Sequence, residues 1–567
     1  MSAEIVDKSL SYARGSSSPA LSEMCIGQEL DATVRRYPEN DALIVCPEHK
    51  RYTYREFLDQ VATAARGLMS IGIQKGDRVG LWSTNNSEWV ITQFATAKIG
   101  AILVNINPSN RAFELEYVLE QSECRALILI ERFRDSDYVD AVRRICPEID
   151  QAENATLHSA RLPELRQLIF IGNDAPKGMI SWNDLLVSGR RISEAELRAR
   201  ESSLDSDDGI NIQYTSGTTG CPKGAVLSHR NIVNNAKLTA DSQHLTHFDR
   251  LCIPVPFYHC FGMVLSNMAC VVTGATMVIP AAHFDAEATL RAVQQESCTA
   301  LHGVPTMFIA ELEHPKFAEF DLHTLRTGIM AGAPCPIATM KRVLNEMHCR
   351  ELTIAYGLTE ASPVITQTNP SDPIELRVES VGKPLPHTEV KIVDRITGEI
   401  VRLGESGELC TRGYLVMKGY YRNPEATRAA LDKEDWLHTG DLAVMDAAGY
   451  CSITGRAKDV IIRGGENIYP REVEEFLYTC PGIRMVQVVG IPDPKYGEQV
   501  AAWIQIEEGS RLTENEVRSF CASRIAHFKI PNFIQIVDEF PMTVTGKVQK
   551  FKIREKIIEQ RAEKGTA

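Results

Sequence analysis

Several features that would assign this chain to a special class of protein are missing. Its 567 residues carry a net charge of −13, so there is no basic excess with which to capture nucleic acid or anionic lipid. The 15 cysteines are scattered and form no C-x-x-C pair, which argues against zinc and redox motifs and favours free thiols in a reducing compartment. The N-terminal stretch lacks an apolar core of signal-peptide length, and Glu4 and Asp7 are unlike an acid-poor transit peptide. We therefore expect a cytoplasmic protein that binds no nucleic acid.

A membrane-spanning run is also missing. The stretch "MVLSNMACVVTGATMVIPAA" (263–282) is uncharged, but Ser266, Asn267, Gly274 and Pro280 interrupt it. These residues predict a buried helix, a glycine turn and a buried strand, and no transmembrane segment.

The patterns that are present predict an α/β protein of more than one domain, because the chain is too long for a single hydrophobic core. Helical spacing at 56–73 and 87–101 alternates with strand-like runs at 77–83 and 101–108, which indicates layered α/β subdomains. After about Gly382, short strands separated by turn signals predict a β-rich lobe.

The last 110 residues or so predict a small mobile α+β domain. Its expected elements are helices at 470–478 and 513–524 and strands at 485–491 and 501–506. We place the division at Arg456, with residues 1–456 forming a large N-terminal domain and residues 457–567 the C-terminal domain.

The segment "YTSGTTGCPKGAVLSH" (214–229) resembles a phosphate-binding loop in its chemistry. Its glycines and Lys223 have the wrong spacing for a Walker A motif. Glycines nevertheless let backbone N–H groups turn toward an anion, hydroxyls add donors, and lysine adds a positive charge. A polyphosphate is the expected guest, although a plain surface turn explains most isolated matches of this kind.

Three further motifs follow the loop in order. They are "AYGLTEAS" (355–362), the long stretch from "WLHTGD" to "GGENIYPREVE" (436–474) and "PMTVTGKVQK" (541–550). With the loop, they resemble the AMP-forming acyl-CoA synthetases of the adenylating-enzyme superfamily over nearly the whole chain. The sequence around them is most similar to the medium-chain fatty acid CoA ligases of animals.

This resemblance implies that a carboxylate attacks the α-phosphorus of ATP and that the thiol of coenzyme A then takes the acyl group. The loop would hold the β- and γ-phosphates, Thr359 the α-phosphate and Glu360 a Mg²⁺ ion. Asp441 and Arg456 would bind the ribose side. The implied ATP-binding residues are Thr215, Ser216, Gly217, Thr218, Thr219, Gly220, Cys221, Pro222, Lys223, Gly332, Ala333, Tyr356, Gly357, Asp441, Arg456 and Lys547.

Lys547 is implied as the catalytic lysine, because a lysine on a glycine turn can offset the charge of the α-phosphate and of the attacking carboxylate. Lys458 is the implied hinge between the two half-reactions. Gly464 and Gly465 would leave a channel for the pantetheine arm, and His259 would gate the acyl site. A lone histidine among aromatic residues is, without the resemblance, more often a packed core residue.

The resemblance leaves several alternatives open. The substrate could be an aromatic or other carboxylic acid, and the product could be loaded onto a carrier protein. A non-catalytic scaffold and a luciferase-type oxidation are the remaining readings. Relatives in the mitochondrial matrix offer a second compartment, and a homo-oligomeric state stays open.

Overall fold

The computed structural model describes residues 4–7, 9–152, 155–215, 222–333, 335–464, 466–522, 524–543 and 546–563. The chain folds into two compact units. The first comprises Met1–Glu4, Arg14–Glu389 and Thr411–Leu437, and the second comprises Ile5–Ala13, Val390–Cys410 and His438–Ala567. The predicted division at Arg456 separates two domains that would move relative to each other, and it stays a prediction.

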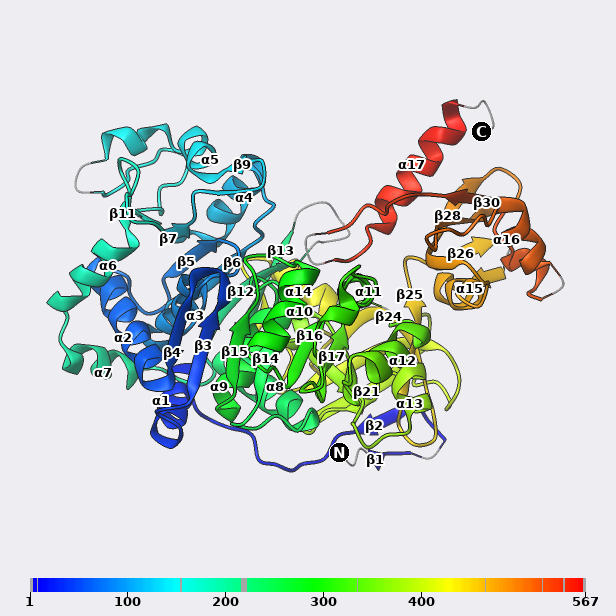
Figure 1. Cartoon of the computed structure of the whole chain (residues 1–567), viewed down its shortest axis with the longest axis horizontal. Helices are drawn as coiled ribbons and strands as arrows, with labels where there is room; N and C mark the ends of the chain where they lie inside the picture. The colour runs from blue at the N-terminus through cyan, green and yellow to red at the C-terminus, as the bar shows by residue number, and fades with distance from the viewer. Residues whose placement is uncertain are drawn as a thin grey trace. The chain divides into compact units, whose positions relative to one another are not determined.

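An eight-stranded sheet lies in the first unit (Figure 1). Its order is β11 (Ile180–Ser181), β10 (Gln167–Phe170), β7 (Cys124–Leu129), β5 (Arg78–Trp82), β6 (Ile102–Ile106), β12 (Gly209–Thr215), β13 (Lys223–Ser228) and β23 (Gly419–Tyr420). The strands from β11 to β12 are parallel, whereas β13 is antiparallel to both β12 and β23. The strands predicted at 77–83 and 101–108 are confirmed as β5 and β6.

A nine-stranded sheet completes the first unit's framework. Its order is β20 (Lys383–Pro384), β19 (Val364–Gln367), β18 (Glu351–Gly357), β17 (Thr327–Ala331), β16 (Ala300–Gly303), β14 (Arg250–Cys252), β15 (Thr276–Ile279), β3 (Asp41–Val45) and β4 (Lys50–Thr53). The strands from β18 to β3 are parallel and antiparallel pairs close both edges. Parallel strands linked by helices are the layered α/β arrangement expected from the alternating pattern.

Helices cover these sheets. The predicted helices are confirmed as α2 (Tyr54–Ser70) and α3 (Ser87–Ile99), the latter beside β6 in Figure 1. Thr53 caps α2 by accepting a hydrogen bond from the backbone N–H of Glu56, the reciprocal capping arrangement that starts a helix. The others are α1 (Ile26–Arg36), α4 (Ala112–Ser122), α5 (Tyr138–Ile145), α6 (Trp182–Ser188), α7 (Glu194–Glu201), α8 (His229–Ser242), α9 (Ala269–Thr273), α10 (Ala286–Gln295), α11 (Pro305–Leu312), α12 (Ile337–Glu346), α13 (Ile374–Glu379) and α14 (Pro424–Ala430), with a small hairpin β8 (Arg132–Phe133) and β9 (Ser136–Asp137).

The uncharged stretch at 263–282 folds inside the first unit as its interruptions predicted. A π-helix at Phe261–Met268 runs into α9, Gly274 turns the chain with φ +83°, and β15 follows. The residues of the π-helix are all buried. Within the described parts of the chain, no helix is long and apolar enough to cross a membrane.

The second unit contains a six-stranded sheet in the order β1 (Glu4–Ile5), β2 (Tyr12–Arg14), β21 (Thr388–Val393), β22 (Gly407–Gly413), β24 (Leu437–Met445) and β25 (Cys451–Arg456). These short strands are the β-rich lobe expected after Gly382. One segment differs from that expectation. Strand β23 joins the eight-stranded sheet of the first unit, because its backbone pairs with β13 at Ala225 and Val226.

The C-terminal part of the second unit has its own sheet and core. The sheet order is β27 (Glu466–Ile468), β26 (Ile461–Arg463), β29 (Gly497–Ile506) and β28 (Ile483–Asp493), and β30 (Phe533–Ile536) pairs with β29. The expected helices appear as α15 (Pro470–Leu477) and the shorter α16 (Glu514–Cys521). A third helix, α17 (Lys550–Glu563), was missed from the sequence. It packs through Ile553 and Ile557, both 0% exposed, against β28 and β29 residues.

Candidate active site

Two hairpins of the first unit bring the main candidate residues together. In the first hairpin, Thr215 at the end of β12 pairs with Lys223 at the start of β13. The intervening loop residues Ser216, Gly217, Thr218, Thr219, Gly220 and Cys221 lie outside the described residues. The loop therefore joins two antiparallel strands, whereas a Walker A loop joins a strand to a helix.

The second hairpin carries Glu360. Strand β18 ends at Gly357, the 3-10 helix η6 (Thr359–Ala361) forms the tip, and β19 returns antiparallel. The backbone N–H of Leu358 donates to the carbonyl of Pro363 at 2.9 Å, and a Cβ on Gly357 would lie 1.7 Å from that same carbonyl oxygen. Only glycine fits this position without a backbone shift, so the "AYGLTE" motif has a structural reason for its glycine.

Hydrogen bonds hold the Glu360 carboxylate in place. The side chain is 8% exposed, and its Oε1 accepts from the Tyr420 hydroxyl at 2.8 Å and from the Thr215 hydroxyl at 3.3 Å. Burial, and then the Glu360 charge, raise the pKa of Tyr420, so its hydroxyl stays a donor. Thr215 ends β12 and Tyr420 lies on β23, both in the eight-stranded sheet, so these bonds tie that sheet to the Glu360 hairpin of the nine-stranded sheet.

Lys223 lies beside the same group of residues. Its Nζ is 5.3 Å from the centre of the Tyr420 ring, a cation–π distance. The carbonyl of its neighbour Pro222 accepts from the Tyr117 hydroxyl at 3.0 Å. A fixed cation is thus present at the base of the loop, near a buried carboxylate, as a site for a phosphate and a divalent cation requires.

The predicted adenine and α-phosphate residues occupy the ends of neighbouring strands. Gly332, with φ +89°, and Ala333 directly follow β17, while Tyr356 is on β18, and Thr359 opens η6 and is 9% exposed. Strands β17 and β18 are parallel neighbours, so these segments leave the sheet at the same edge. Ligands of open α/β sheets bind at this carboxyl edge.

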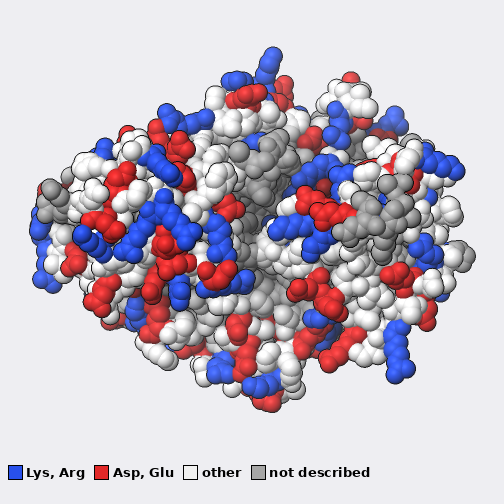
Figure 2. All heavy atoms as spheres, turned by 90° about the horizontal axis from the view of Figure 1, so that it is seen from above, with Lys and Arg blue, Asp and Glu red and all other residues white. Residues whose placement is uncertain are grey.

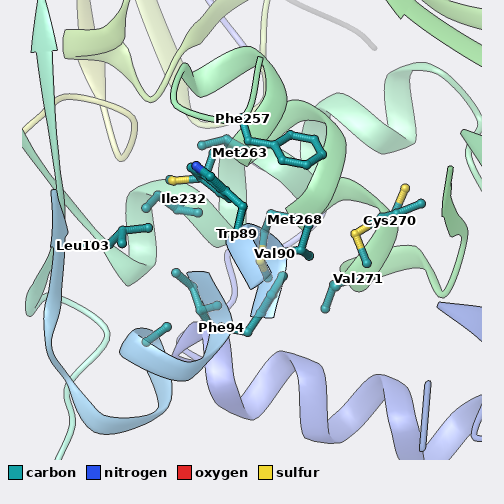
Figure 3. Packing of buried hydrophobic residues seen from close by; sticks show 14 of the residues in the cluster. Trp89, Val90, Phe94, Leu103, Ile232, Phe257, Met263, Met268, Cys270 and Val271 are labelled. Carbon is teal, nitrogen blue, oxygen red and sulfur yellow. The ribbon is translucent and has the colours of Figure 1, made fainter. Parts of the chain in front are cut away.

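His259 lies where the chain enters the π-helix. Its backbone carbonyl accepts from Met263 N–H at 3.0 Å, and the Tyr258 and His259 rings meet edge to face at 6.5 Å. The side chain is half-buried. Figure 3 shows the aromatic and thioether side chains of the nearby residues in sequence, Phe257 and Met263, packed together with Trp89. An extended π-helix is rare and often marks a functional site.

In the second unit, the structure brings together the two residues predicted to bind the ribose side. Asp441 on β24 is the cross-strand partner of Arg456 on β25, and the Arg456 Nε donates to Asp441 Oδ1 at 3.1 Å. The Asp441 side chain is 9% exposed and the Arg456 side chain 59% exposed. The carboxylate is therefore held by the sheet while the guanidinium stays accessible.

The remaining candidates of the second unit lie on turns. Lys458 is exposed on the turn after β25, and Gly464, with φ +60°, follows β26 and donates its N–H to the Tyr496 carbonyl at 2.8 Å. Gly465 lies outside the described residues.

Lys547 follows a glycine turn, as predicted. Gly546 has φ +76°, the Lys547 N–H donates to Thr543 Oγ1 at 2.9 Å, and Thr543 N–H donates back to the Lys547 carbonyl at 2.7 Å. By contrast, the Nζ of Lys550 lies 2.6 Å from Glu474 Oε1. Lys550 therefore has a structural ion pair on α15, and Lys547 stands on a separate turn.

The sequence interpretation missed Tyr420. It lies in "VMKGYY", which was read only as a short strand. Its role depends on β23 pairing with β13, which no local pattern reveals. Free thiols are confirmed at the 14 cysteines described.

Charged side chains of both signs share the visible surface. In Figure 2, basic and acidic side chains are interspersed over that face.

This fold is that of the adenylating enzymes, and the comparisons identify the family. The chain belongs to the AMP-binding enzyme family, whose profile matches residues 30–421, and the profile of the AMP-binding enzyme C-terminal domain matches residues 472–547. YngI of Bacillus subtilis, provisionally named an acyl-CoA synthetase, is 53% identical over 94% of this chain and 97% of its own. The mitochondrial medium-chain acyl-CoA ligase ACSF2 of Danio rerio is 45% identical over 97% of this chain and 91% of its own. The crystal structure of ATP-bound MatB from Rhodopseudomonas palustris is similar with a TM-score of 0.81 and 27% identity, over 94% of this chain and 99% of that one.

Proposed function

We propose that this chain is an AMP-forming acyl-CoA ligase that activates a fatty acid of medium length. The observation that carries the proposal is the arrangement around Glu360, a buried carboxylate that accepts from Thr215 at one end of the loop, while Lys223 at the other end is the cross-strand partner of Thr215. Membership of the AMP-binding enzyme family and the names of its relatives YngI and ACSF2 give the reaction class.

In the first half-reaction, a carboxylate oxygen of the acid attacks the α-phosphorus of ATP. The bond from that phosphorus to the bridging oxygen breaks, and pyrophosphate leaves. The main barrier is charge, because an anion approaches a polyanion, so electrostatic stabilisation dominates. Lys223 and the loop would hold the leaving phosphates, Thr359 would donate to the α-phosphate, and Lys547 would offset the charge of both reacting anions.

Glu360 fits a magnesium ion. A hard cation prefers one or two carboxylates and phosphate oxygens, and Glu360 offers a carboxylate fixed by the Tyr420 hydroxyl. When bound, the ion would neutralise charge on the β- and γ-phosphates.

In the second half-reaction, the sulfur of coenzyme A attacks the acyl carbonyl carbon of acyl-AMP and AMP leaves. Lys547 and the thiol cannot approach the same face together, so the C-terminal domain turns about Lys458 between the steps. Gly464 and Gly465 then line the pantetheine channel. Replacing Gly465 with a bulky residue should spare adenylation and block thioester formation; a variant that still makes thioester contradicts the channel.

The acyl chain is the least constrained part of the proposal. We place it beyond His259, against apolar residues of the π-helix and α3 (Figure 3). A carboxylic acid passing His259 would present its alkyl end to this apolar wall, as small-molecule sites usually require.

The direct test is ATP- and CoA-dependent release of AMP across saturated acids of increasing length, with aromatic acids alongside. A maximum at medium-chain acids supports the proposal. A maximum at aromatic acids corrects the substrate and leaves the mechanism intact. Adenylation without any acyl-CoA product would instead favour a carrier-loading enzyme and overturn the ligase assignment.

For the compartment, we propose a reducing one. The 14 described cysteines are free thiols, 13 of them buried, which fits the cytoplasm or the mitochondrial matrix. YngI is bacterial and ACSF2 is mitochondrial, and both settings are reducing. Thiol counting on freshly lysed cells tests this, since any oxidised pair would contradict it.

A further inference from the structure

A second cluster of reactive side chains lies away from the Glu360 hairpins, inside the six-stranded sheet. Glu408 and Cys410 are two residues apart on β22, so they share one face of the strand, and His438 projects from the adjacent strand β24. One ligand atom from each residue lies within 4.8 Å of the others. None of the three is assigned a role by the adenylation chemistry above.

We propose that Glu408, Cys410 and His438 form a binding site for a zinc-type divalent cation. Two of the three distances between ligand atoms match a tetrahedral site. His438 Nδ1 is 3.3 Å from Glu408 Oε2 and 3.4 Å from Cys410 Sγ. Zinc bonds of about 2.0–2.3 Å set at tetrahedral angles separate nitrogen from oxygen by about 3.4 Å and nitrogen from sulfur by about 3.5 Å.

The hydrogen-bond directions place the cation. The Nδ1 atom of His438 faces both Glu408 Oε2 and Cys410 Sγ. A proton on Nδ1 would lie between these three atoms, and a metal ion would take the place of that proton. A metal there replaces a shared proton and needs no rearrangement of the three side chains.

The surroundings are those of a supported ligand set. The other carboxylate oxygen of Glu408, Oε1, accepts from the Gly440 N–H at 2.9 Å, which leaves Oε2 directed at His438. Outer hydrogen bonds of this kind orient ligands in metal sites. Cys410 is 0% exposed, whereas the side chain of His438 is 36% exposed, so one side of the site opens to solvent and a water can complete four-fold coordination.

The sulfur selects the class of metal. Thiolate and imidazole favour zinc and similar transition metals, whereas magnesium and calcium take only oxygen ligands. Binding releases the proton of the Cys410 thiol and the one shared by His438, both to the buffer.

The site has a structural consequence for the nucleotide residues. Gly440, with φ +72°, is bound by Glu408 and directly precedes Asp441. An occupied site therefore links β22 to the part of β24 that carries Asp441.

The test uses the full-length protein stripped of metal with a chelator, and Co²⁺ as the probe. We expect one Co²⁺ per chain, with the sulfur-to-cobalt absorption band of a thiolate ligand and tetrahedral visible bands, both displaced by Zn²⁺. Cys410→Ser should abolish the sulfur band, and His438→Gln should weaken binding by at least the roughly 10–100-fold that loss of an outer partner of a ligand costs. The matched controls are Cys451→Ser, a buried cysteine of the neighbouring strand β25, and His323→Gln, an exposed histidine of the first unit.

The outcomes separate the proposal from its rivals. If the wild type shows no sulfur band, the three side chains form only a structural ion pair and the proposal is wrong. A band that persists in Cys410→Ser would place the metal at another cysteine and also overturn it. If Cys410→Ser fails to fold, Glu408→Gln, which keeps an acceptor for Gly440, decides the matter: zinc should raise the thermal midpoint of the wild type and not of this variant.

Discussion

Tyr420→Phe is the sharpest perturbation of the Glu360 site. The substitution removes one oxygen atom and keeps the ring, so the cation–π contact with Lys223 at 5.3 Å survives. What is lost is the 2.8 Å hydrogen bond to Glu360 Oε1, which leaves the Thr215 hydroxyl at 3.3 Å as the other described donor to that oxygen. A hydrogen bond to a charged, largely buried acceptor contributes about 1.5–3 kcal/mol.

That loss should appear in adenylation, because Glu360 would no longer be held in the orientation that binds the cation. We expect the catalytic efficiency of acid- and ATP-dependent pyrophosphate release to fall about 10–100-fold, with a higher Mg²⁺ requirement. Thioester formation from supplied acyl-AMP should change little. Tyr421→Phe is the matched control, since it removes the same atom from the next residue and should leave adenylation near the wild-type value.

Two results would refute this reasoning. Wild-type adenylation by Tyr420→Phe would mean that the hydroxyl does not position Glu360. Equal loss of both half-reactions would mean that the substitution damages the fold and not the metal-binding carboxylate.

Three other substitutions test separate parts of the structure. Gly357→Ala puts a Cβ 1.7 Å from a backbone oxygen of Pro363 and should cost about 1–3 kcal/mol and lower adenylation, measured by thermal unfolding and pyrophosphate release; unchanged values would contradict the geometry. Lys98→Met removes a 3% exposed ammonium and leaves the half-buried Glu201 unpaired, so urea unfolding should show a loss of about 3 kcal/mol, and a loss near zero would argue against the pair. Hydrogen bonds with Cys410 and with the Glu408 carboxylate raise the pKa of His438 to about 10. The stabilisation from its positive charge is therefore complete below about pH 6.5 and is lost as the pH rises through 10. In the presence of chelator, the difference in unfolding free energy between the wild type and His438→Gln should become smaller over this range, and a constant difference would contradict the pKa shift.

Much of the architecture was readable from local patterns. The apolar runs of β5 and β6 predict strands, and the capped, amphipathic pattern of α2 predicts a helix, each from a few neighbouring residues. The interruptions at Gly274 and Pro280 likewise excluded a spanning helix.

The sequence fails to predict features that leave only a weak local pattern. The π-helix at Phe261–Met268 differs from an α-helix only in its hydrogen-bond spacing, which the hydrophobic pattern does not encode. Among the α17 side chains that the structure describes, which are mostly charged and polar, only Ile553 and Ile557 are buried, so the apolar stripe is too narrow to stand out.

The candidate site likewise contains residues that the sequence predicts and one, Tyr420, that it does not. Glu360, Asp441, Arg456 and Lys547 stand in recognisable motifs, and their local geometry follows from adjacent turns and strand ends. Tyr420 is 60 residues from its partner, and its hydroxyl reaches Glu360 only because β23 extends the sheet beyond β13.

The central claim is that Lys547 drives adenylation and not the thioester step. The most direct measurement compares the two half-reactions in Lys547→Ala, with Lys550→Ala as the control because Lys550 is paired with Glu474. We predict that pyrophosphate release from acid and ATP falls by orders of magnitude while thioester formation from supplied acyl-AMP survives. Equal loss of both half-reactions, or the same pattern in Lys550→Ala, would contradict the account.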